Sequence, residues 1–403
     1  MARRRYYAGR DYRKALSIAE LREIAKRRLP AFSFEFLESG GEDELSLAWN
    51  RDIFRSFRFV PRTLVNTSMC DIGTTYCGSH YKSPLIVGPS GHNNIMRSKG
   101  DTHLARASAA EGIPYTLSTL ANTRLENIAK DTSGTLWMQL YVFKDKALTE
   151  DIIKRAEDAG YDALVFTVDA NVFGWREWDR RRFRAPGQLS YRDTIDALMH
   201  PRWLWDVMIP NGVPPMANVI DFFPPDARDT RSATTIVPNL FAPTIDWQTV
   251  DELRARWKKK LILKGILSVE DACKAADVGC DAIILSNHGG RHLDTCISPM
   301  EILPEVADRL RHRISIIIDS GFRRGSDVVK AIALGAHAVM IGRAALYGLA
   351  AGGEGGVSHA IRLLNNEIAR VLGMIGCPSL SNIDATYLKS NAAFLGHGPL
   401  GDV

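Results

Sequence analysis

The chain has 403 residues, 45% of them hydrophobic and 24% charged, which is the balance of an ordinary globular protein. A net charge of +5 is too small on its own to imply nucleic acid as a partner. The sequence has no apolar run of about 18 residues, and its basic start, MARRRYYAGRDYRK, lacks the apolar stretch of a signal peptide. The six cysteines form no CxxC pair, so we expect reduced thiols in the cytoplasm and no metal centre.

The first 80 residues predict a helical cap. Residues 17–28, SIAELREIAKRR, form an amphipathic pattern with Ser17 at the N-cap position. A second helical stretch surrounds residues 32–37 and stops at Gly40-Gly41. We expect residues 1–80 to be a cap that packs on the domain that follows, and not an independent domain.

Eight short apolar runs follow the cap, each ending in polar residues or glycine. Continuous runs of this kind are typical of parallel strands that are buried on both faces. They lie at residues 85–88, 115–118, 136–141, 163–169, 261–265, 282–286, 314–319 and 338–342.

Helical patterns separate these runs. Residues 149–159 and 268–278 each begin with a capping residue, Thr149 or Ser268, and each is followed by a glycine. A third pattern spans residues 327–334. Eight strand–helix units predict an α/β fold, a (β/α)8 TIM barrel over residues 81–378, with a long insertion at about 180–244 after the fourth strand and a tail at 379–403. A doubly wound sheet is the alternative, but no GxGxxG follows the first strand.

The ends of the last two strands predict a phosphate site. IDSGFRRGSD and IGRAALYG place glycines and arginines where barrels commonly hold a phosphate on backbone N–H groups and a helix N-terminus. A phosphorylated substrate or cofactor is therefore expected.

The other strand ends carry groups that suit oxidation of a hydroxy acid by a bound flavin. Lys264 is a cation for a developing anion, and His288 with Asp169 is a base with its orienting carboxylate. Arg176 and Arg291 are suited to clamping a carboxylate. Each residue alone also has an ordinary structural explanation, such as a cap or a solvated charge.

SNHGGR (286–291) with Asp294, the segment DSGFRRGSDVVKAIALGA (319–336) and the IGR turn resemble the FMN-dependent 2-hydroxy-acid oxidase and dehydrogenase family. QLYVFKD (139–145), TVDANVFGWRE (167–177) and ILKG (262–265) also match. The likeness runs from about residue 11 to 378. It implies an FMN enzyme that oxidises an (S)-2-hydroxy acid to the 2-oxo acid.

The resemblance also implies site residues. His288, Asp169 and Tyr141 would be catalytic, and Phe36, Tyr141, Arg176, His288 and Arg291 would contact the substrate. FMN would be held by Pro89, Ser90, Gly91, Ser118, Gln139, Thr167, Lys264, Ser286, Asp319, Ser320, Gly321, Phe322, Arg323, Gly342 and Arg343.

Three positions depart from the family pattern. Phe36 stands where the family usually has a substrate-touching tyrosine, and His292 stands where it often has glutamine. Gly91 occupies a position that is often alanine in oxygen-using oxidases, which favours a dehydrogenase.

Residues 200–219, HPRWLWDVMIPNGVPPMANV, and the phrase GRAALYGLAAGGEGGV are most similar to the mandelate dehydrogenase branch of the family. That likeness predicts mandelate or another aromatic acid in an apolar pocket near Phe36 and Leu120. Lactate-sized acids remain an alternative.

The insertion predicts contact with a membrane surface. Its apolar residues follow a basic stretch, REWDRRRFR, as suits a peripheral membrane contact. They include Trp203, Trp205, Met208, Ile209, Val219, Ile220, Phe222 and Phe223. The likeness to the mandelate dehydrogenase branch implies peripheral attachment to the inner face of the cell membrane and a quinone acceptor, and the family likeness implies a homotetramer. The alternatives are a lid or an oligomer contact, a soluble oxidase that makes hydrogen peroxide, and a flavin-free phosphate-binding isomerase or lyase.

Overall fold

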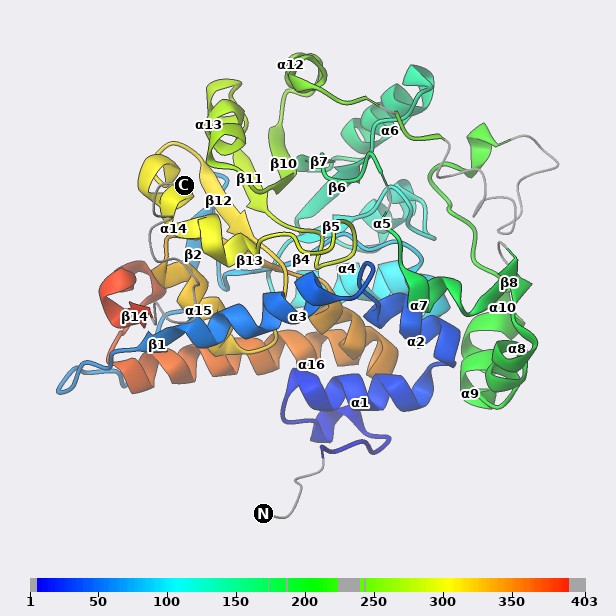
Figure 1. Cartoon of the computed structure of the whole chain (residues 1–403), viewed down its shortest axis with the longest axis horizontal. Coiled ribbons are helices and arrows are strands. Elements are labelled where there is room, and N and C mark those ends of the chain that lie inside the picture. Colours follow the sequence, from blue (N-terminus) through cyan, green and yellow to red (C-terminus); the bar gives the residue numbers. More distant parts are fainter. Residues whose placement is uncertain (1–5, 173, 186–187, 224–239, 243, 391–403) are drawn as a thin grey trace, which may run out of the picture.

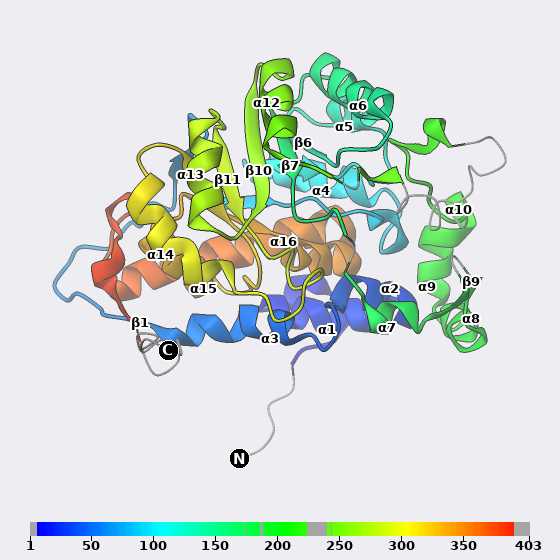
Figure 2. The ribbon, with the colours of Figure 1, turned by 45° about the horizontal axis from the view of Figure 1, so that its top comes forward.

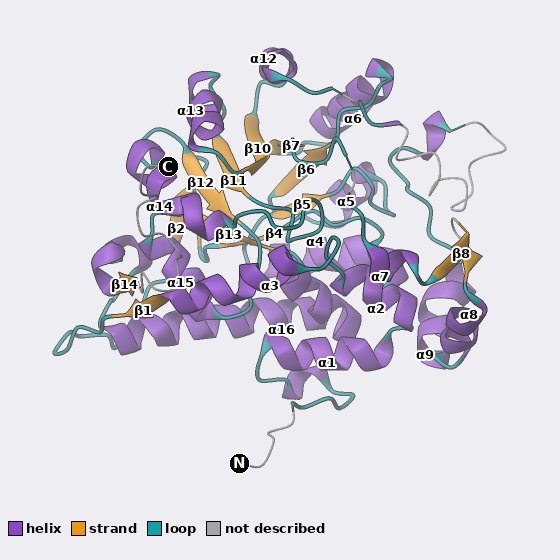
Figure 3. Ribbon diagram, viewed as in Figure 1, coloured by secondary structure: helices purple, strands orange, loops and turns teal. Residues whose placement is uncertain are grey.

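The computed structural model of the chain describes residues 6–172, 174–185, 188–223, 240–242 and 244–390. Eight parallel strands close into a barrel in the order β10, β11, β12, β13, β4, β5, β6 and β7 (Figure 1, Figure 3). They are β4 (Leu85–Val87), β5 (Tyr115–Leu117), β6 (Leu136–Leu140), β7 (Ala163–Thr167), β10 (Lys260–Ile266), β11 (Ala282–Leu285), β12 (Ser315–Ile318) and β13 (Ala338–Ile341). The predicted barrel is confirmed, because all eight apolar runs supply its strands.

A helix follows each strand, and the insertion lies between β7 and α12. The helices are α4 (Gly100–Ala110), α5 (Leu125–Asp131), α6 (Lys146–Asp158), α12 (Trp247–Arg256), α13 (Val269–Asp277), α14 (Pro299–Leu310), α15 (Gly325–Ala333) and α16 (Arg343–Ile375). Ser268 caps α13 as predicted. The predicted cap at Thr149 was wrong, because α6 begins three residues earlier, where the Asp145 side chain accepts a hydrogen bond from the Ala147 N–H. α16 is kinked at Gly352 and Gly353, whose backbone angles are not helical.

The amino-terminal residues pack against the barrel helices. Ser17 caps α1 (Ile18–Arg28), and α1 lies beside α16 in both views (Figure 1, Figure 2). The remaining elements here are η1 (Tyr12–Lys14), α2 (Ala31–Glu38), α3 (Leu45–Asp52), η2 (Ile53–Ser56), β1 (Phe57–Phe59), β2 (Thr74–Tyr76) and β3 (Ser79–Tyr81), followed by η3 (Asn93–Ile95) after β4. At the other end of the chain come η7 (Leu380–Asn382), η8 (Ala385–Tyr387) and β14 (Leu388–Ser390), and β14 pairs with β1.

The hairpin of β2 and β3 packs against the interior of the barrel. Tyr76 stacks on Tyr81, with ring centroids 4.3 Å apart, and meets Trp137 of β6 edge to face at 6.4 Å. These aromatic side chains share one buried cluster with Ile262, Ile284 and other inward-facing strand residues. The hairpin therefore covers one end of the barrel.

The insertion projects from one edge of the molecule (Figure 1, Figure 2). Its elements are α7 (Glu177–Arg180), β8 (Phe183–Ala185), β9 (Gln188–Leu189), α8 (Tyr191–Leu198), α9 (Pro201–Trp203), the π-helical turn η4 (Leu204–Met208), α10 (Ile209–Asn211) and η5 (Ile220–Phe222). The Trp203 indole N–H donates to the Ile95 carbonyl at 2.7 Å, and Arg28 pairs with Asp206 at 2.9 Å. These contacts fix the projection to the elements around β4 and α1.

The apolar residues of the insertion divide into two sets. Trp203, Val219 and Phe223 are buried, so they are not available to a membrane as the sequence suggested. The exposed set includes Tyr191, Ile195, Leu198, Met199, Trp205, Ile209, Val213 and Phe222. None of the helices in the described ranges is long and apolar enough to cross a bilayer.

Candidate active site

A row of buried polar side chains lies at the ends of β5, β6 and β7. The Ser118 hydroxyl donates to the Gln139 side-chain oxygen at 3.2 Å, and the Gln139 amide donates to Thr167 Oγ1 at 3.1 Å. Thr119 Oγ1 donates to the Gln139 carbonyl at 2.6 Å. The predicted residues Ser118, Gln139 and Thr167 are therefore brought together, and their mutual bonds fix the direction of the amide.

Lys264 continues this row on β10, where it pairs in register with Thr167 of β7. Its Nζ atom lies 2.8 Å from Ser286 Oγ and 3.1 Å from Asp319 Oδ2. Burial opposes the positive charge, but Asp319 and Asp169 outweigh it and raise the pKa of Lys264. The lysine is therefore a fixed cation in the floor of the site.

His288 and Asp169 form a hydrogen-bonded pair. His288 Nδ1 lies 3.1 Å from Asp169 Oδ1. Burial opposes ionisation of Asp169, yet His288 and Lys264 hold its pKa well below the usual range. With Nδ1–H donating to this carboxylate, the Nε2 atom of a neutral His288 is left as a proton acceptor.

His292 packs on His288, with ring centroids 4.1 Å apart at an angle of 60°. Its Nδ1 atom lies 3.2 Å from the Val172 carbonyl. Burial, aided by His288, lowers the pKa of His292 to about 3. The ring is therefore neutral near pH 7, and it supports one side of the candidate base.

Two arginines converge on Phe36. The guanidinium carbons of Arg176 and Arg291 lie 5.7 and 5.6 Å from the centre of that ring. Arg291 also donates to the Ser39 and Phe36 carbonyls, each at 3.0 Å. Burial and the charge of Arg176 hold the pKa of Arg291 well below its usual value. Two mutually repelling guanidinium groups form a site that an anion would stabilise.

Tyr141 closes another side of this space. Burial raises the pKa of its phenol above the usual range, so the hydroxyl keeps its proton. Its ring meets Phe241 edge to face at 5.0 Å. Phe241 is distant from Tyr141 in the sequence, and no sequence motif predicted that it lies beside the site.

The turn that carries His288 is anchored by the amino-terminal elements. Asp294 accepts hydrogen bonds from the Ser46 and Leu45 N–H groups at 2.8 and 3.1 Å, at the start of α3. The Gly41 N–H donates to the Gly290 carbonyl at 2.8 Å. Asp294 is thus a structural anchor of the turn, a role that the spacing alone could not reveal.

The predicted phosphate residues lie around the first turns of α15 and α16. The Ser320 hydroxyl donates to Asp319 at 2.7 Å and accepts from the Gly289 N–H at 3.1 Å. A methyl group added at the exposed Gly342 would meet no atom within 4 Å. Open space at a helix N-terminus is what an anion requires. With the polar row beside it, the site fits FMN.

Two predicted cofactor residues turn their side chains elsewhere. Phe322 is buried against Phe54, with ring centroids 5.0 Å apart. The Arg343 guanidinium donates to the Leu37, Ser39 and Gly289 carbonyls at 3.1, 3.0 and 2.8 Å. It therefore ties α16 to the end of α2, and its contact with phosphate stays a prediction.

The remaining predicted cofactor residues lie on loops beside the same space. Pro89, Ser90 and Gly91 follow β4, and Ser90 donates to the Asn93 side chain at 2.8 Å. A methyl group at Gly91 would lie 3.2 Å from the Leu120 Cβ atom. Gly321 takes a positive φ of 90° after β12. Arg323 donates to the Phe322 carbonyl at 2.8 Å.

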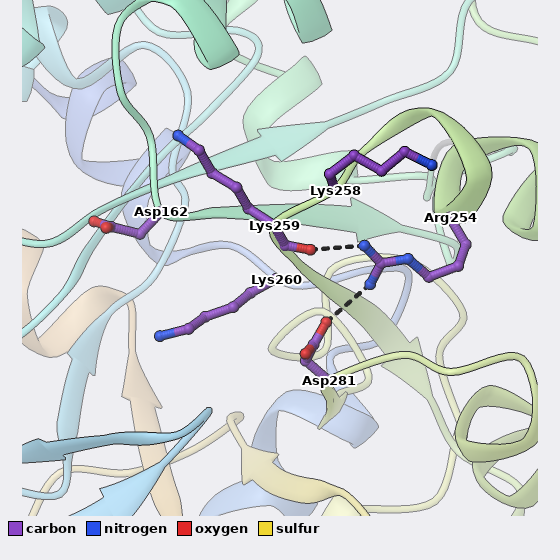
Figure 4. A pocket seen from close by; sticks show the side chains of 6 residues that line it. All are labelled: Asp162, Arg254, Lys258, Lys259, Lys260 and Asp281. Carbon is purple, nitrogen blue, oxygen red and sulfur yellow. Dashed lines mark hydrogen bonds and ion pairs between the residues drawn. The ribbon is translucent and has the colours of Figure 1, made fainter.

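A surface pocket of about 440 Å³ lies near the start of β10 (Figure 4). It is lined by Asp162, Arg254, Lys258, Lys259, Lys260 and Asp281. Arg254 is engaged with Asp281 at 2.9 Å and with the Lys259 carbonyl at 2.7 Å. Catalytic groups sit at the opposite ends of barrel strands, so this pocket does not compete with the site above. No group of three or more possible metal ligands occurs among the described residues.

The FMN-dependent dehydrogenase family pattern matches residues 25–390, and the chain belongs to that family. It is an FMN-dependent oxidoreductase that acts on 2-hydroxy acids. This excludes the flavin-free isomerase or lyase considered from the sequence.

The chain is 40% identical to the (S)-mandelate dehydrogenase of Pseudomonas putida, over 93% of this chain and 94% of that protein. It is 36% identical to the L-lactate oxidase of a Nostoc species, over 93% of this chain and 98% of that protein. The crystal structure of an (S)-mandelate dehydrogenase, described as a monotopic membrane protein, matches with a TM-score of 0.89 at 40% identity and covers 94% of this chain and 100% of that one. A mandelate oxidase with benzoyl-formic acid matches with a TM-score of 0.77 at 34% identity, over 94% and 99% of the two chains.

Proposed function

We propose that this enzyme oxidises (S)-mandelate, or another (S)-2-hydroxy acid with an aromatic side chain, to the 2-oxo acid and passes the electrons to a membrane quinone. The observation that carries the substrate class is the His288–Asp169 pair near two arginines that share the Phe36 ring. The 40% identity to (S)-mandelate dehydrogenase over nearly the whole chain supports the aromatic substrate.

In this proposal, Arg176 and Arg291 bind the substrate carboxylate, and the unprotonated Nε2 of His288 receives one proton from the substrate. Asp169 keeps the imidazole oriented and stabilises its protonated form, because the carboxylate stays ionised. FMN, when bound, supplies the acceptor for the two electrons that the substrate loses. Tyr141 offers a neutral hydroxyl to the substrate, and Lys264 places its charge where the electrons arrive.

The cofactor contacts belong to the same proposal. Ser118, Gln139, Thr167, Lys264 and Ser286 would line the isoalloxazine ring, with Pro89, Ser90 and Gly91 on the loop after β4. The backbone from Asp319 to Arg323, with Gly342 and Arg343, would hold the ribityl chain and phosphate through N–H groups. We also propose that the chain is organised as a cap (1–80), a barrel (81–378) with its insertion, and a tail.

The insertion is proposed to seat the enzyme on the inner face of the cell membrane, as a peripheral homotetramer. Trp205 and Ile209 are 73% and 65% exposed, so the apolar face has no cover within the described residues. The Arg184 guanidinium carbon lies 4.7 Å from the ring centre of the exposed Tyr191, and this arginine would meet anionic headgroups. The structural relative described as a monotopic membrane protein supports the same arrangement.

A soluble oxidase is the second candidate, and the 36% identity to an L-lactate oxidase favours it. One experiment separates the two. The purified yellow enzyme is mixed anaerobically with (S)-mandelate or L-lactate, and the flavin absorbance is followed. Bleaching by mandelate supports the proposal, whereas bleaching by lactate alone would overturn the aromatic substrate. Stoichiometric hydrogen peroxide in air, with no turnover of a quinone analogue, would overturn the dehydrogenase assignment.

A further inference from the structure

His92 is a histidine that no sequence motif singled out. It follows Gly91 on the loop after β4 and adopts a left-handed backbone, with φ of 56°. Its N–H donates to the Leu120 carbonyl at 3.3 Å, and its carbonyl accepts from the Ile95 N–H at 3.1 Å. These bonds fix the backbone of the loop on both sides of the residue.

The imidazole faces the wall of the candidate substrate site. Its ring meets Phe36 edge to face, with centroids 5.8 Å apart at 87°. Phe36 is the same ring over which the Arg176 and Arg291 guanidinium groups lie. His92 therefore belongs to the same cluster of side chains as the two arginines of the proposed carboxylate site, on the side formed by the loop after β4.

The ring of His92 is neutral at physiological pH. Burial, aided by the charge of Arg176, lowers its pKa to about 4. Across the described residues, its ring nitrogens have no hydrogen-bond partner in the protein. A neutral imidazole carries one donor and one acceptor, and the half-buried His92 leaves both free to bind a polar group of a ligand.

We propose that His92 determines side-chain specificity: it forms a hydrogen bond with a hydroxyl group on the side chain of an aromatic 2-hydroxy acid. Two guanidinium groups already match the carboxylate, and a neutral imidazole would add little to them. A phenolic hydroxyl, which both donates and accepts, matches the imidazole, while Phe36 and Leu120 pack around the aromatic ring. The proposal rests on the 2-hydroxy-acid site described above and names its preferred substrate class.

The test compares (S)-4-hydroxymandelate with (S)-mandelate by kcat/KM in the FMN-loaded enzyme. We expect the wild type to prefer the hydroxylated acid about ten-fold, as one hydrogen bond supplies. His92→Phe keeps an aromatic ring against Phe36 without the nitrogens, and should bring the ratio close to one. His92→Gln, which restores a donor and an acceptor, should recover part of the preference.

A binding measurement accompanies the kinetics. The dissociation constants of the two corresponding 2-oxo acids, read from the flavin spectrum, should follow the same pattern. An unchanged ratio in His92→Phe would overturn the proposal. An equal loss for both acids would also overturn it, because His92 would then contact a part that the acids share. If His92→Phe does not retain FMN, the kcat/KM ratios of the wild type and His92→Gln decide. A wild-type ratio near one overturns the proposal. A wild-type ratio of about ten that is lower in His92→Gln supports it. Failure of both acids to reduce the wild type would instead reject the proposed function.

Discussion

Asp169 packs directly over the backbone of Gly265, the residue at which β10 changes register. A methyl group at Gly265 would lie 2.5 Å from the Asp169 Cγ atom, and the glycine has a φ of +106°. The carboxylate that orients His288 therefore depends on a residue that has no side chain.

Gly265→Ala should displace Asp169 and lower kcat at least ten-fold, because a misplaced carboxylate no longer orients the base. Gly279→Ala is the matched control, since Gly279 has a similar φ of +84° and open space around its Cα. Both variants carry backbone strain, but the control should lose stability without a comparable loss of kcat. Equal kcat values in the two variants would contradict the positional role of Gly265.

His288→Gln should lower the rate of FMN reduction by about 10²–10⁴-fold, which is the usual contribution of a general base. FMN should remain bound, because the row from Ser118 to Lys264 is untouched. Stopped-flow absorbance under anaerobic conditions measures the rate, and the flavin content of the purified protein serves as the control. Normal reduction of this variant would reject His288 as the base.

Arg291→Lys should raise KM about 10- to 100-fold with a smaller effect on kcat. The lysine keeps a charge but loses the planar pair of donors, and charge-assisted hydrogen bonds are worth about 1.5–3 kcal/mol. Arg309→Lys, on the exposed face of α14, is the control. A fall in kcat with no change in KM would mean that Arg291 acts on the chemical step and does not anchor the carboxylate.

His292→Gln should make the enzyme less sensitive to acid unfolding. The unfolded chain takes up a proton on His292 near its ordinary pKa of 6.5, whereas the folded chain resists it until about 3. The free energy of unfolding is therefore unaffected by His292 above pH 6.5. Below that pH, it falls by at most about 1.4 kcal/mol per pH unit, because only the unfolded chain binds the proton. Urea unfolding at pH 7.5 and 5.0 measures the effect, with His80→Gln at an exposed position as the control. A stability difference that does not change with pH would contradict this account.

Replacing Trp205 and Ile209 together with serine should move the enzyme from membranes to the soluble fraction with little change in kcat for a soluble dye acceptor. Both side chains are largely exposed, so their loss should leave the fold intact. Replacing the exposed Leu293 and Met374 in the same way is the control. If the native chain is fully soluble without detergent, the membrane contact is rejected.

The sequence predicted the barrel well because buried parallel strands leave continuous apolar runs that need no long-range information. It also pointed to SNHGGR, because the chemistry is concentrated in one short motif, and the structure pairs His288 of this motif with Asp169 while the assigned roles stay predictions. His92 and Phe241 were missed, since each enters the site through contacts with residues distant in the chain. For the same reason, the sequence did not predict that the Arg343 guanidinium donates to the carbonyls of residues 37 and 39.

The hairpin of β2 and β3 fills one end of the barrel with aromatic side chains. Tyr76 and Trp137 are both fully buried at that end, where their rings meet edge to face. We therefore expect the acid, the oxo acid and the electron acceptor to share the mouth at the carboxyl ends of the strands. The two half-reactions should then alternate at one opening. Such ping-pong kinetics predict parallel double-reciprocal plots, with each substrate inhibiting at high concentration.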